Sequence, residues 1–322
     1  MIVDFHSHTF PEKIAAAAIE KLSQASHSRP FTDGTEEGLC RHMQMSGITH
    51  SVILPVATAA RQVVRINDAS ARINEASERG LLSFAAMHPD FEDPRGELVR
   101  VRDLGFRGIK IHPVYQGRNL DSPAFLRILE ICAELGLLVV THAGVDIGFP
   151  GVVHASPAMA LHALREIGCS PSRTHVSDRT ERNAFDERLD EERAGANSSE
   201  GFRLILAHMG GWRNWDEVAV LAPAFVETGV VMIDTAFSTG NFPALPDGYW
   251  KEGETRMLGE RAFAGIIRAF GAERVLFGSD SPWGSQSEML AFLNRAELET
   301  WEREMILWKN AARLLGLPNN QK

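Results

Sequence analysis

Two histidines separated by one residue stand near the start of the chain, in the stretch MIVDFHSHTF. Side chains alternate between the two faces of a strand, so His6 and His8 project into the same surroundings if this stretch is extended. Two neutral imidazoles that face together are able to share a cation. The spacing therefore raises the hypothesis of a metal site, although a core histidine next to a capping one has the same spacing.

Polar residues also end several later apolar runs. They are Lys110 and His112 in GIKIHPV, His142 in LLVVTHAG, His208 in RLILAHMGG, and Asp280 in RVLFGSDSPW. Taken alone, each has an ordinary explanation, such as a hydrogen-bonded core histidine or, for Asp280, a helix cap before Ser281-Pro282. Together, His6, His8, His142, His208 and Asp280 supply nitrogen and oxygen ligands that suit zinc, manganese or iron and leave an open coordination position. The combination favours a metal centre.

Eight short apolar runs, which we expect to be strands, must position these side chains. They cover residues 2–8, 50–57, 81–89, 108–114, 137–144, 203–211, 230–237 and 274–283. Near-continuous apolar runs are typical of parallel strands buried on both faces, and the intervening segments 61–80 and 121–136 have helical spacing and end at glycine. Eight such units predict an α/β fold, the closed (β/α)8 TIM barrel. A doubly wound open sheet is the competing architecture, but HSHTFPEK follows the first strand instead of a glycine-rich fingerprint.

A barrel brings the carboxyl ends of its strands together at the face where active sites lie. His112, Tyr115, Trp212 and Trp283 fall just past those ends and either line a substrate pocket or pack as ordinary aromatic residues. Arg213 has the geometry to bind a substrate carboxylate, or it is a solvated arginine that opens the next helix. The irregular segment 238–256 follows the seventh strand and is a candidate lid.

Composition limits the functional classes. The 322 residues carry a formal net charge of -9, with no Lys/Arg-rich run, so no nucleic-acid partner is indicated. No apolar run reaches the length of a membrane span, and Met1 leads directly into the first strand, so we expect a cytoplasmic protein with a small-molecule substrate. Three cysteines without CxxC spacing indicate neither disulfides nor a thiolate zinc site.

We expect one domain over residues 1–322, with a polar insertion at 169–200, between helix 5 and strand 6, on the face opposite the site.

The motifs resemble those of the amidohydrolase superfamily, in particular its amidohydrolase-related branch, which includes aminocarboxymuconate semialdehyde decarboxylase. The resemblance covers nearly the whole chain and rests on HSH, GIKIHP, THAG, LAHMGGW, GSDSPW and the closing MILWKNAARLLGL. It implies that His6, His8, His142 and Asp280 hold a single divalent metal ion, zinc before manganese or iron. It also implies that His208 is the acid/base residue, and it suggests a homodimer.

Lys110 has two interpretations. In other members of the superfamily a lysine on the fourth strand is carbamylated and bridges two metal ions, and the chain contains the residues for that arrangement. A buried lysine otherwise needs a partner, so the second interpretation is that Lys110 meets a carboxylate of the barrel or of the substrate. The branch that the motifs resemble is usually mononuclear, which favours the second interpretation.

Three functions follow from these residues. The first is hydrolysis of a small carboxylate, lactone or amide by a metal-activated water, with His208 or Asp280 transferring protons. The second is non-oxidative decarboxylation or hydration of an unsaturated or aromatic acid. The third is a barrel without activity that serves as a binding module, against which the complete set of ligand types argues.

Overall fold

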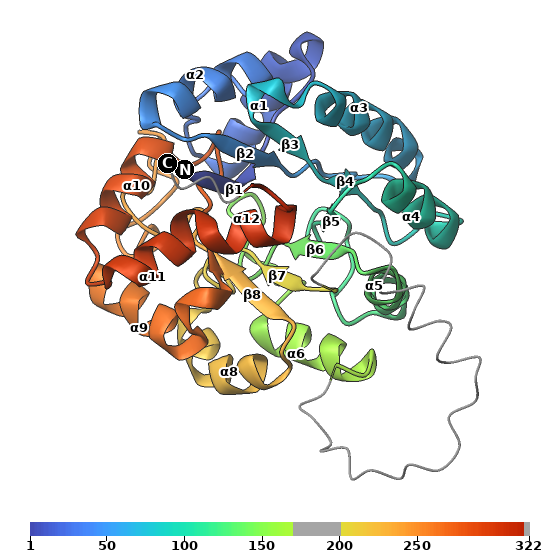
Figure 1. Cartoon of the computed structure of the whole chain (residues 1–322). Coiled ribbons are helices and arrows are strands. Elements are labelled where there is room, and N and C mark those ends of the chain that lie inside the picture. Colours follow the sequence, from blue (N-terminus) through green and yellow to red (C-terminus); the bar gives the residue numbers. More distant parts are fainter. Residues whose placement is uncertain (170–200, 319–322) are drawn as a thin grey trace.

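Parallel strands form a ring surrounded by helices in the computed structural model, which describes residues 1–169 and 201–318 (Figure 1). The strands are β1 (Val3–Ser7), β2 (His50–Ile53), β3 (Leu81–Ser83), β4 (Ala85–Ala86), β5 (Gly108–Ile111), β6 (Leu138–Thr141), β7 (Leu204–Leu206), β8 (Val231–Asp234) and β9 (Val275–Leu276). Strands β1 to β3 pair in sequence order, as do β4 to β9. Only Phe84 separates β3 from β4, and its N–H donates to Ile53 O at 2.9 Å, so the two segments form one position of the ring.

Backbone hydrogen bonds between the first and last strands close the ring. The N–H of Phe5 donates to Phe277 O at 2.7 Å, and the N–H of Asp280 donates to His6 O at 2.8 Å. A parallel bridge between Ser7 and Ser281 continues this pairing. The predicted TIM barrel is confirmed, and the open doubly wound sheet is ruled out.

Helices surround the ring, except for α12, which lies across one end, and several of them begin where the sequence supplies a capping side chain. They are α1 (Glu12–Ser26), α2 (Glu36–Ser46), α3 (Val63–Glu75), α4 (Pro94–Asp103), α5 (Pro123–Leu135), α6 (Pro157–Glu166), α8 (Trp215–Glu227), α9 (Glu260–Phe270), α10 (Gln286–Arg295), α11 (Thr300–Glu304) and α12 (Asn310–Leu315); the short turns are η1 (Ala60–Gln62), η2 (Ser77–Arg79), η3 (Ala272–Arg274) and η4 (Met305–Lys309). The Ser156 hydroxyl, for example, accepts the Met159 N–H at the start of α6. The expected helix over 121–136 is α5, which ends at Gly136 in the left-handed conformation.

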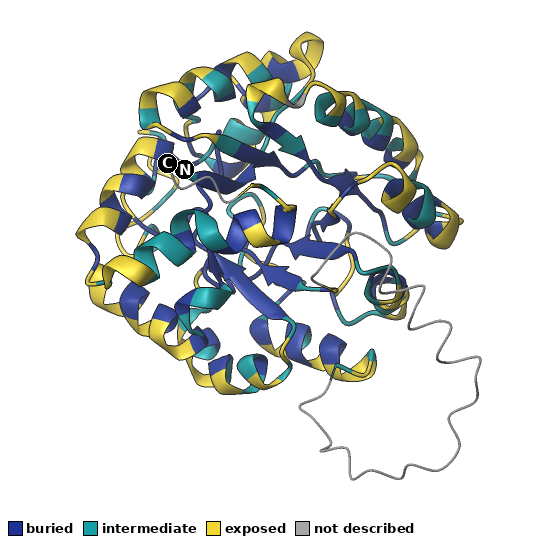
Figure 2. Ribbon diagram, in the orientation of Figure 1, coloured by how far each residue is buried: buried dark blue, intermediate teal, exposed yellow. Residues whose placement is uncertain are grey.

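The barrel contains two layers of apolar core. An inner cluster fills the ring itself and includes Val3, Phe5, Phe84 and Val140, with Leu314 of α12 packed against it. Figure 1 shows α12 lying across the middle of the ring, so this helix closes one end of the barrel. The larger cluster lies between strands and helices, and burial accordingly falls from the strands outward (Figure 2). This rigid frame leaves the other end free for a site.

Two predictions concern regions away from the site. Of the predicted insertion at 169–200, all residues after Cys169 lie outside the described part of the chain. Among the described residues, none of the helices has the length and apolar character needed to cross a membrane.

Candidate active site

The side chains that the sequence predicted to converge line one pocket at the carboxyl ends of the strands. The predicted residues that line it are His6, His8, Lys110, His112, Tyr115, His142, His208, Trp212, Asp280 and Trp283. The remainder of the wall is largely apolar, with Leu54, Val56 and Phe237 among its residues. The pocket thus has a polar floor and an apolar wall, as small-molecule sites commonly do.

Arg213 is the one predicted site residue that does not line this pocket. It is exposed, and its guanidinium carbon lies 5.6 Å from the centre of the Trp212 ring. Trp212 is buried and takes the inward position of this turn, so the next side chain projects to solvent. The prediction that Arg213 binds a substrate carboxylate is therefore not supported by its position.

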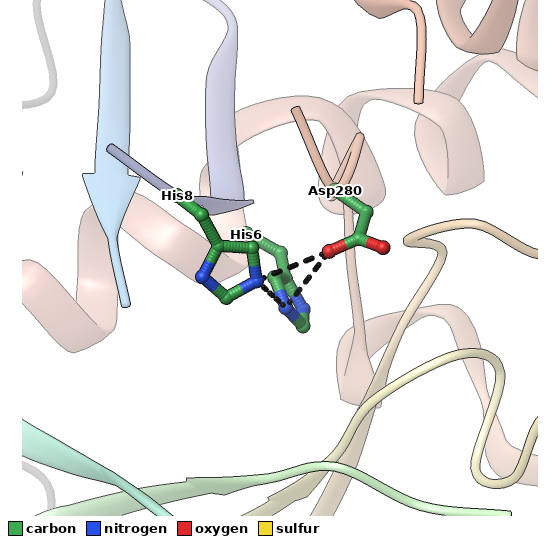
Figure 3. Close-up of side chains that lie close together, drawn as sticks. All are labelled: His6, His8 and Asp280. Carbon is green, nitrogen blue, oxygen red and sulfur yellow. Dashed lines mark hydrogen bonds and ion pairs between the residues drawn. The ribbon is translucent and has the colours of Figure 1, made fainter. Parts of the chain in front are cut away.

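His6, His8 and Asp280 form a compact cluster (Figure 3). The Nε2 atoms of the two imidazoles lie 3.2 Å apart, and Asp280 Oδ1 lies 3.4 Å from His6 Nε2 and 3.1 Å from His8 Nε2. Burial by itself raises the pKa of Asp280, but contact with His8 and the proximity of His6 and His208 lower it to about 2. Asp280 is therefore an anion that faces two ring nitrogens.

Hydrogen bonds outside the cluster fix where the two imidazoles carry their protons. His6 Nδ1 lies 2.7 Å from Asp234 Oδ2, and His8 Nδ1 lies 2.7 Å from Leu54 O. Both partners are acceptors, so each neutral ring donates from Nδ1 and keeps a lone pair on Nε2. Two lone pairs and a carboxylate oxygen then face one another without a hydrogen between them. A bound cation resolves this repulsion, and the donor set suits zinc, manganese or iron.

A proton on His6 does not readily replace that cation. Burial and the nearby charge of Lys110 lower the pKa of His6 well below its ordinary value. The rings of His6 and His8 meet at 72°, so lone pairs that lie in the two ring planes can converge on one point. The cluster therefore fits a metal ion both electrostatically and geometrically.

A second group of possible ligands, His112, His142 and Asp146, fits an ion less well. The rings of His112 and His142 stack at 4.4 Å with only 14° between their planes. Nitrogen lone pairs lie in the ring plane, so those of two parallel rings cannot both point at one ion. We take the first cluster as the candidate metal centre.

His142, the predicted fourth ligand, is close to this centre but is not part of the compact cluster. Its Nδ1 lies 3.1 Å from His208 Nε2, and His208 Nδ1 donates to Ala236 O at 3.0 Å. His142 therefore donates from Nδ1 and keeps a lone pair on Nε2, which is buried without a hydrogen-bond partner. An orphaned buried lone pair beside the cluster is what a fourth ligand requires, although the ring must turn away from His112 to complete the set.

Asp234 belongs to the site but is not among the residues predicted from the sequence. Besides His6 Nδ1, its carboxylate accepts the N–H groups of His208 at 2.9 Å and Ala236 at 3.0 Å. Burial raises its pKa, and these contacts act in the opposite direction. A single carboxylate thus orients one ring of the candidate metal centre and the backbone of the residue predicted to be the acid/base group. The sequence does contain the pattern that could have identified Asp234, because this residue ends an apolar run just as the other site residues do.

We expect Asp234→Asn to weaken zinc binding by about 10- to 100-fold. The amide oxygen of the new asparagine can still accept the backbone N–H groups of His208 and Ala236. Its amide nitrogen then faces His6 Nδ1, so two hydrogen-bond donors point at each other. The ring must then move its proton to Nε2, the ligand atom. Competition with a chelator measures the affinity. Asp121→Asn, which removes the carboxylate 3.1 Å from the exposed His162, is the matched control, and equal affinity in both variants would contradict this role.

Asp4 holds the turn that carries Asp280. It accepts the Ser279 N–H at 2.9 Å, the Ser279 hydroxyl at 2.6 Å and the Gln286 amide at 2.7 Å, and it is fully buried. Burial raises its pKa to about 6, while these hydrogen bonds lower it. Because Asp4 lies two residues before His6, it fixes the distance between the first and last strands at the cluster.

Lys110 lies on the floor of the pocket beside the cluster. Its Nζ is 3.4 Å from His6 Nε2, and burial lowers its pKa to about 8 although Asp234, Asp280 and Asp146 favour its charge. Among the pocket-lining residues that the structure describes, Lys110 is the only lysine or arginine. It is thus placed to meet an anionic group.

The segment 238–256, predicted as a candidate lid, packs beside the pocket mouth. Trp250 Nε1 donates to Ser26 O at 2.9 Å, and the Tyr249 ring stacks on His27 at 3.7 Å. Ser26 also lines the pocket. The segment therefore joins the end of α1 to the rim of the site.

Comparisons with known proteins agree with this architecture. A family model described as Amidohydrolase matches residues 3–317. A search of curated proteins gave no match. The solved structures that the chain resembles include a dihydroxybenzoic acid decarboxylase from Polaromonas with bound manganese and 2-nitroresorcinol, with 15% identity, a TM-score of 0.61, and coverage of 98% of this chain and 97% of that chain.

Two further structures show the same fold. The 5-carboxyvanillate decarboxylase of Sphingomonas paucimobilis is 14% identical, with a TM-score of 0.61 and coverage of 98% of this chain and 99% of that chain. A candidate 2-pyrone-4,6-dicarboxylic acid hydrolase from Pseudomonas putida is 18% identical, with a TM-score of 0.58 and coverage of 99% and 98%. At these identities the likeness establishes a shared fold, not a shared substrate.

Proposed function

We propose, from the premise that this chain belongs to the amidohydrolase family, that it is a metal-dependent enzyme acting on a small organic acid. The observation that carries the proposal is the cluster of His6, His8 and Asp280, in which three acceptors face one another beside the buried ammonium of Lys110. A cation completes the cluster, and the ammonium supplies a partner for a substrate carboxylate.

We propose that His6, His8, Asp280 and, after rotation of its ring, His142 hold one divalent ion. Zinc suits these ligands, and manganese is the ion named for the Polaromonas relative. When bound, such an ion polarises a carbonyl or carboxylate group and lowers the pKa of water. Carbamylation of Lys110 with a second ion is the alternative, and the number of ions per chain distinguishes the two.

The chain's own residues would orient the substrate and transfer protons. Lys110 would bind the carboxylate, and the apolar wall around Leu54, Val56 and Phe237 would enclose the body of the substrate and exclude water. Trp212 lines the pocket, and its buried Nε1–H has no acceptor among the described residues, so it would donate to a substrate oxygen that came within reach. His208 would transfer the proton, because its Nδ1 is committed to Ala236 O and its Nε2 carries the lone pair, which rotation of His142 toward the metal would release from its hydrogen bond.

Hydrolysis of a lactone, ester or amide bond is the first candidate reaction. His208 in this tautomer is suited to accept a proton from water, which is the role of a general base. Non-oxidative decarboxylation is the second candidate, and two observations favour it. Lys110 is placed to hold a carboxylate against an apolar wall, and two of the relatives named above are decarboxylases of aromatic acids.

Turnover in water labelled with oxygen-18 separates the two reactions. The zinc- or manganese-loaded protein is incubated with panels of aromatic acids and of lactones, esters and amides that bear a carboxylate. Hydrolysis transfers the label into the product, whereas decarboxylation releases CO2 from the substrate. We expect one of these outcomes, abolished by a chelator and restored by the metal. Absence of any metal-dependent turnover across the panels, from protein that holds its metal, would contradict the proposal.

A further inference from the structure

Asp146 is a buried carboxylate in the pocket that has no role in the scheme above. It lies in the loop after β6, four residues past His142, and only 5% of it is exposed. Its Oδ1 accepts the Gly148 N–H at 2.8 Å, which fixes the orientation of the side chain. Its Oδ2 is 3.5 Å from His112 Nε2, longer than an ordinary hydrogen bond. One oxygen therefore retains the capacity to accept from a ligand.

Aromatic stacking holds the partner of Asp146 in place. The His112 ring lies between Tyr115, at 4.0 Å, and His142, at 4.4 Å, with both pairs nearly parallel. The Tyr115 N–H points at His112 Nδ1 from 3.5 Å, which favours the tautomer that carries its proton on Nε2, toward Asp146. When His142 turns toward the metal cluster, the stack on Tyr115 still holds the His112 ring beside Asp146.

Asp146 and the metal cluster belong to the same pocket. His142 stacks on His112 and contacts His208, and the His208 ring lies 5.3 Å from the His6 ring. A planar substrate whose carboxylate lies near the cluster and Lys110 would therefore extend its ring toward His112 and Asp146. Asp146 would meet a substituent on that ring.

Charge then decides which substituents are accepted. The pocket-lining residues of the described chain include two carboxylates, Asp146 and Asp280, and one ammonium, Lys110. The ion and Lys110 serve one substrate carboxylate, and no second cation is available at the Asp146 side of the pocket among those residues. A second substrate carboxylate would face Asp146 across a pocket with a largely apolar wall, where like charges repel strongly. A hydroxyl or amino group would instead donate to Asp146 Oδ2.

We propose that Asp146 is a specificity-determining residue that selects a monocarboxylic acid with a hydrogen-bond donor on its ring and excludes dicarboxylic acids. This inference rests on the proposed function, in that the substrate carboxylate binds at the metal cluster. It separates the chain from relatives named for dicarboxylic acids, such as the 2-pyrone-4,6-dicarboxylic acid hydrolase.

Calorimetric binding of simple aromatic acids to the zinc-loaded full chain tests the inference without turnover. The probes are benzoate, the three hydroxybenzoate isomers and the three benzenedicarboxylate isomers. The measurement is made at about pH 7.5, above the pKa of about 7 to which burial raises Asp146 and below the pKa of about 8 to which burial lowers Lys110. We expect the best hydroxybenzoate to bind about tenfold tighter than benzoate, and every dicarboxylate to bind weaker than benzoate.

Asp146→Asn removes the charge and keeps the shape of the side chain. In this variant the best hydroxybenzoate should bind at most about threefold tighter than benzoate. The affinity of the best dicarboxylate, relative to that of benzoate, should rise about tenfold. Asp90→Asn is the control, because Asp90 is an exposed carboxylate outside the pocket that pairs with Arg118. Zinc content and the melting temperature show whether each variant is folded and loaded, and Asp146→Ala serves as a second variant.

Two other outcomes have separate meanings. In the first, benzoate binds only when zinc is present, but Asp146→Asn and Asp146→Ala have the same affinity ratios between the acids as the unchanged chain. That result would overturn the inference about Asp146 and leave the proposed function standing. If zinc-loaded protein binds none of the acids, substrate recognition through a carboxylate at the cluster is wrong, and the proposed function fails together with the inference.

Discussion

Replacing His208 with asparagine is expected to lower turnover by at least about a thousandfold while metal content stays unchanged. The proton-transfer nitrogen of His208 is Nε2, and an amide cannot accept and release a proton at neutral pH. His208 is not one of the proposed ligands, so the ion should remain. The measurement is turnover of whichever substrate the labelling experiment identifies, together with zinc content by elemental analysis.

Asparagine is the appropriate replacement because of the backbone. His208 has a φ of 62°, in the left-handed region where asparagine is better tolerated than most residues. Loss of activity would therefore not be explained by backbone strain. His162→Asn, at an exposed histidine, controls for a general effect of the exchange. Turnover within about threefold of the unchanged chain would remove His208 from the proton-transfer role.

Asp280→Asn and His6→Ala are each expected to reduce bound zinc below about one tenth of an equivalent and to abolish turnover. Asp280 provides the only negative charge in the compact cluster, and His6 contributes the nitrogen that Asp234 orients. Asp280 also has a positive φ, 68°, so asparagine again keeps the local conformation. The readouts are elemental analysis and the melting temperature with and without added zinc.

A matched variant shows whether the loss is local. Asp247→Asn alters an exposed aspartate that contacts a histidine, His27, at 2.8 Å in the segment beside the pocket mouth. It should keep its zinc and most of its turnover, because a surface pair contributes little. Full zinc occupancy in both Asp280→Asn and His6→Ala would show that the ion, if present, is held elsewhere.

The barrel and most of the site were predictable from the sequence for one physical reason. Each of the motifs around His8, His112, His208 and Asp280 places a polar residue at the end of an apolar run, and parallel strands that alternate with helices bring such ends together. The same reasoning explains why Asp234 should have been included, since it ends β8 in the same way.

The remaining features depend on side-chain directions and loop paths, which a pattern of residue types does not contain. Arg213 follows a tight turn that buries Trp212 and sends the arginine outward. His142 ends its strand as predicted, but its ring stacks on His112 instead of facing the compact cluster. Asp146 lies in a loop, so no periodicity marked it. We propose that residues 1–322 form one domain, which agrees with a family match that runs from residue 3 to 317.

The metal content of the purified chain tests the central claim most directly. The protein is prepared without added metal or chelator, and elemental analysis gives the number of divalent ions per chain. We predict about one equivalent of zinc or manganese, because one compact cluster of lone pairs and a carboxylate requires one cation. About two equivalents would contradict the mononuclear site and indicate a carbamylated Lys110. No metal, and none regained on reconstitution, would contradict the claim that His6, His8 and Asp280 form a metal centre.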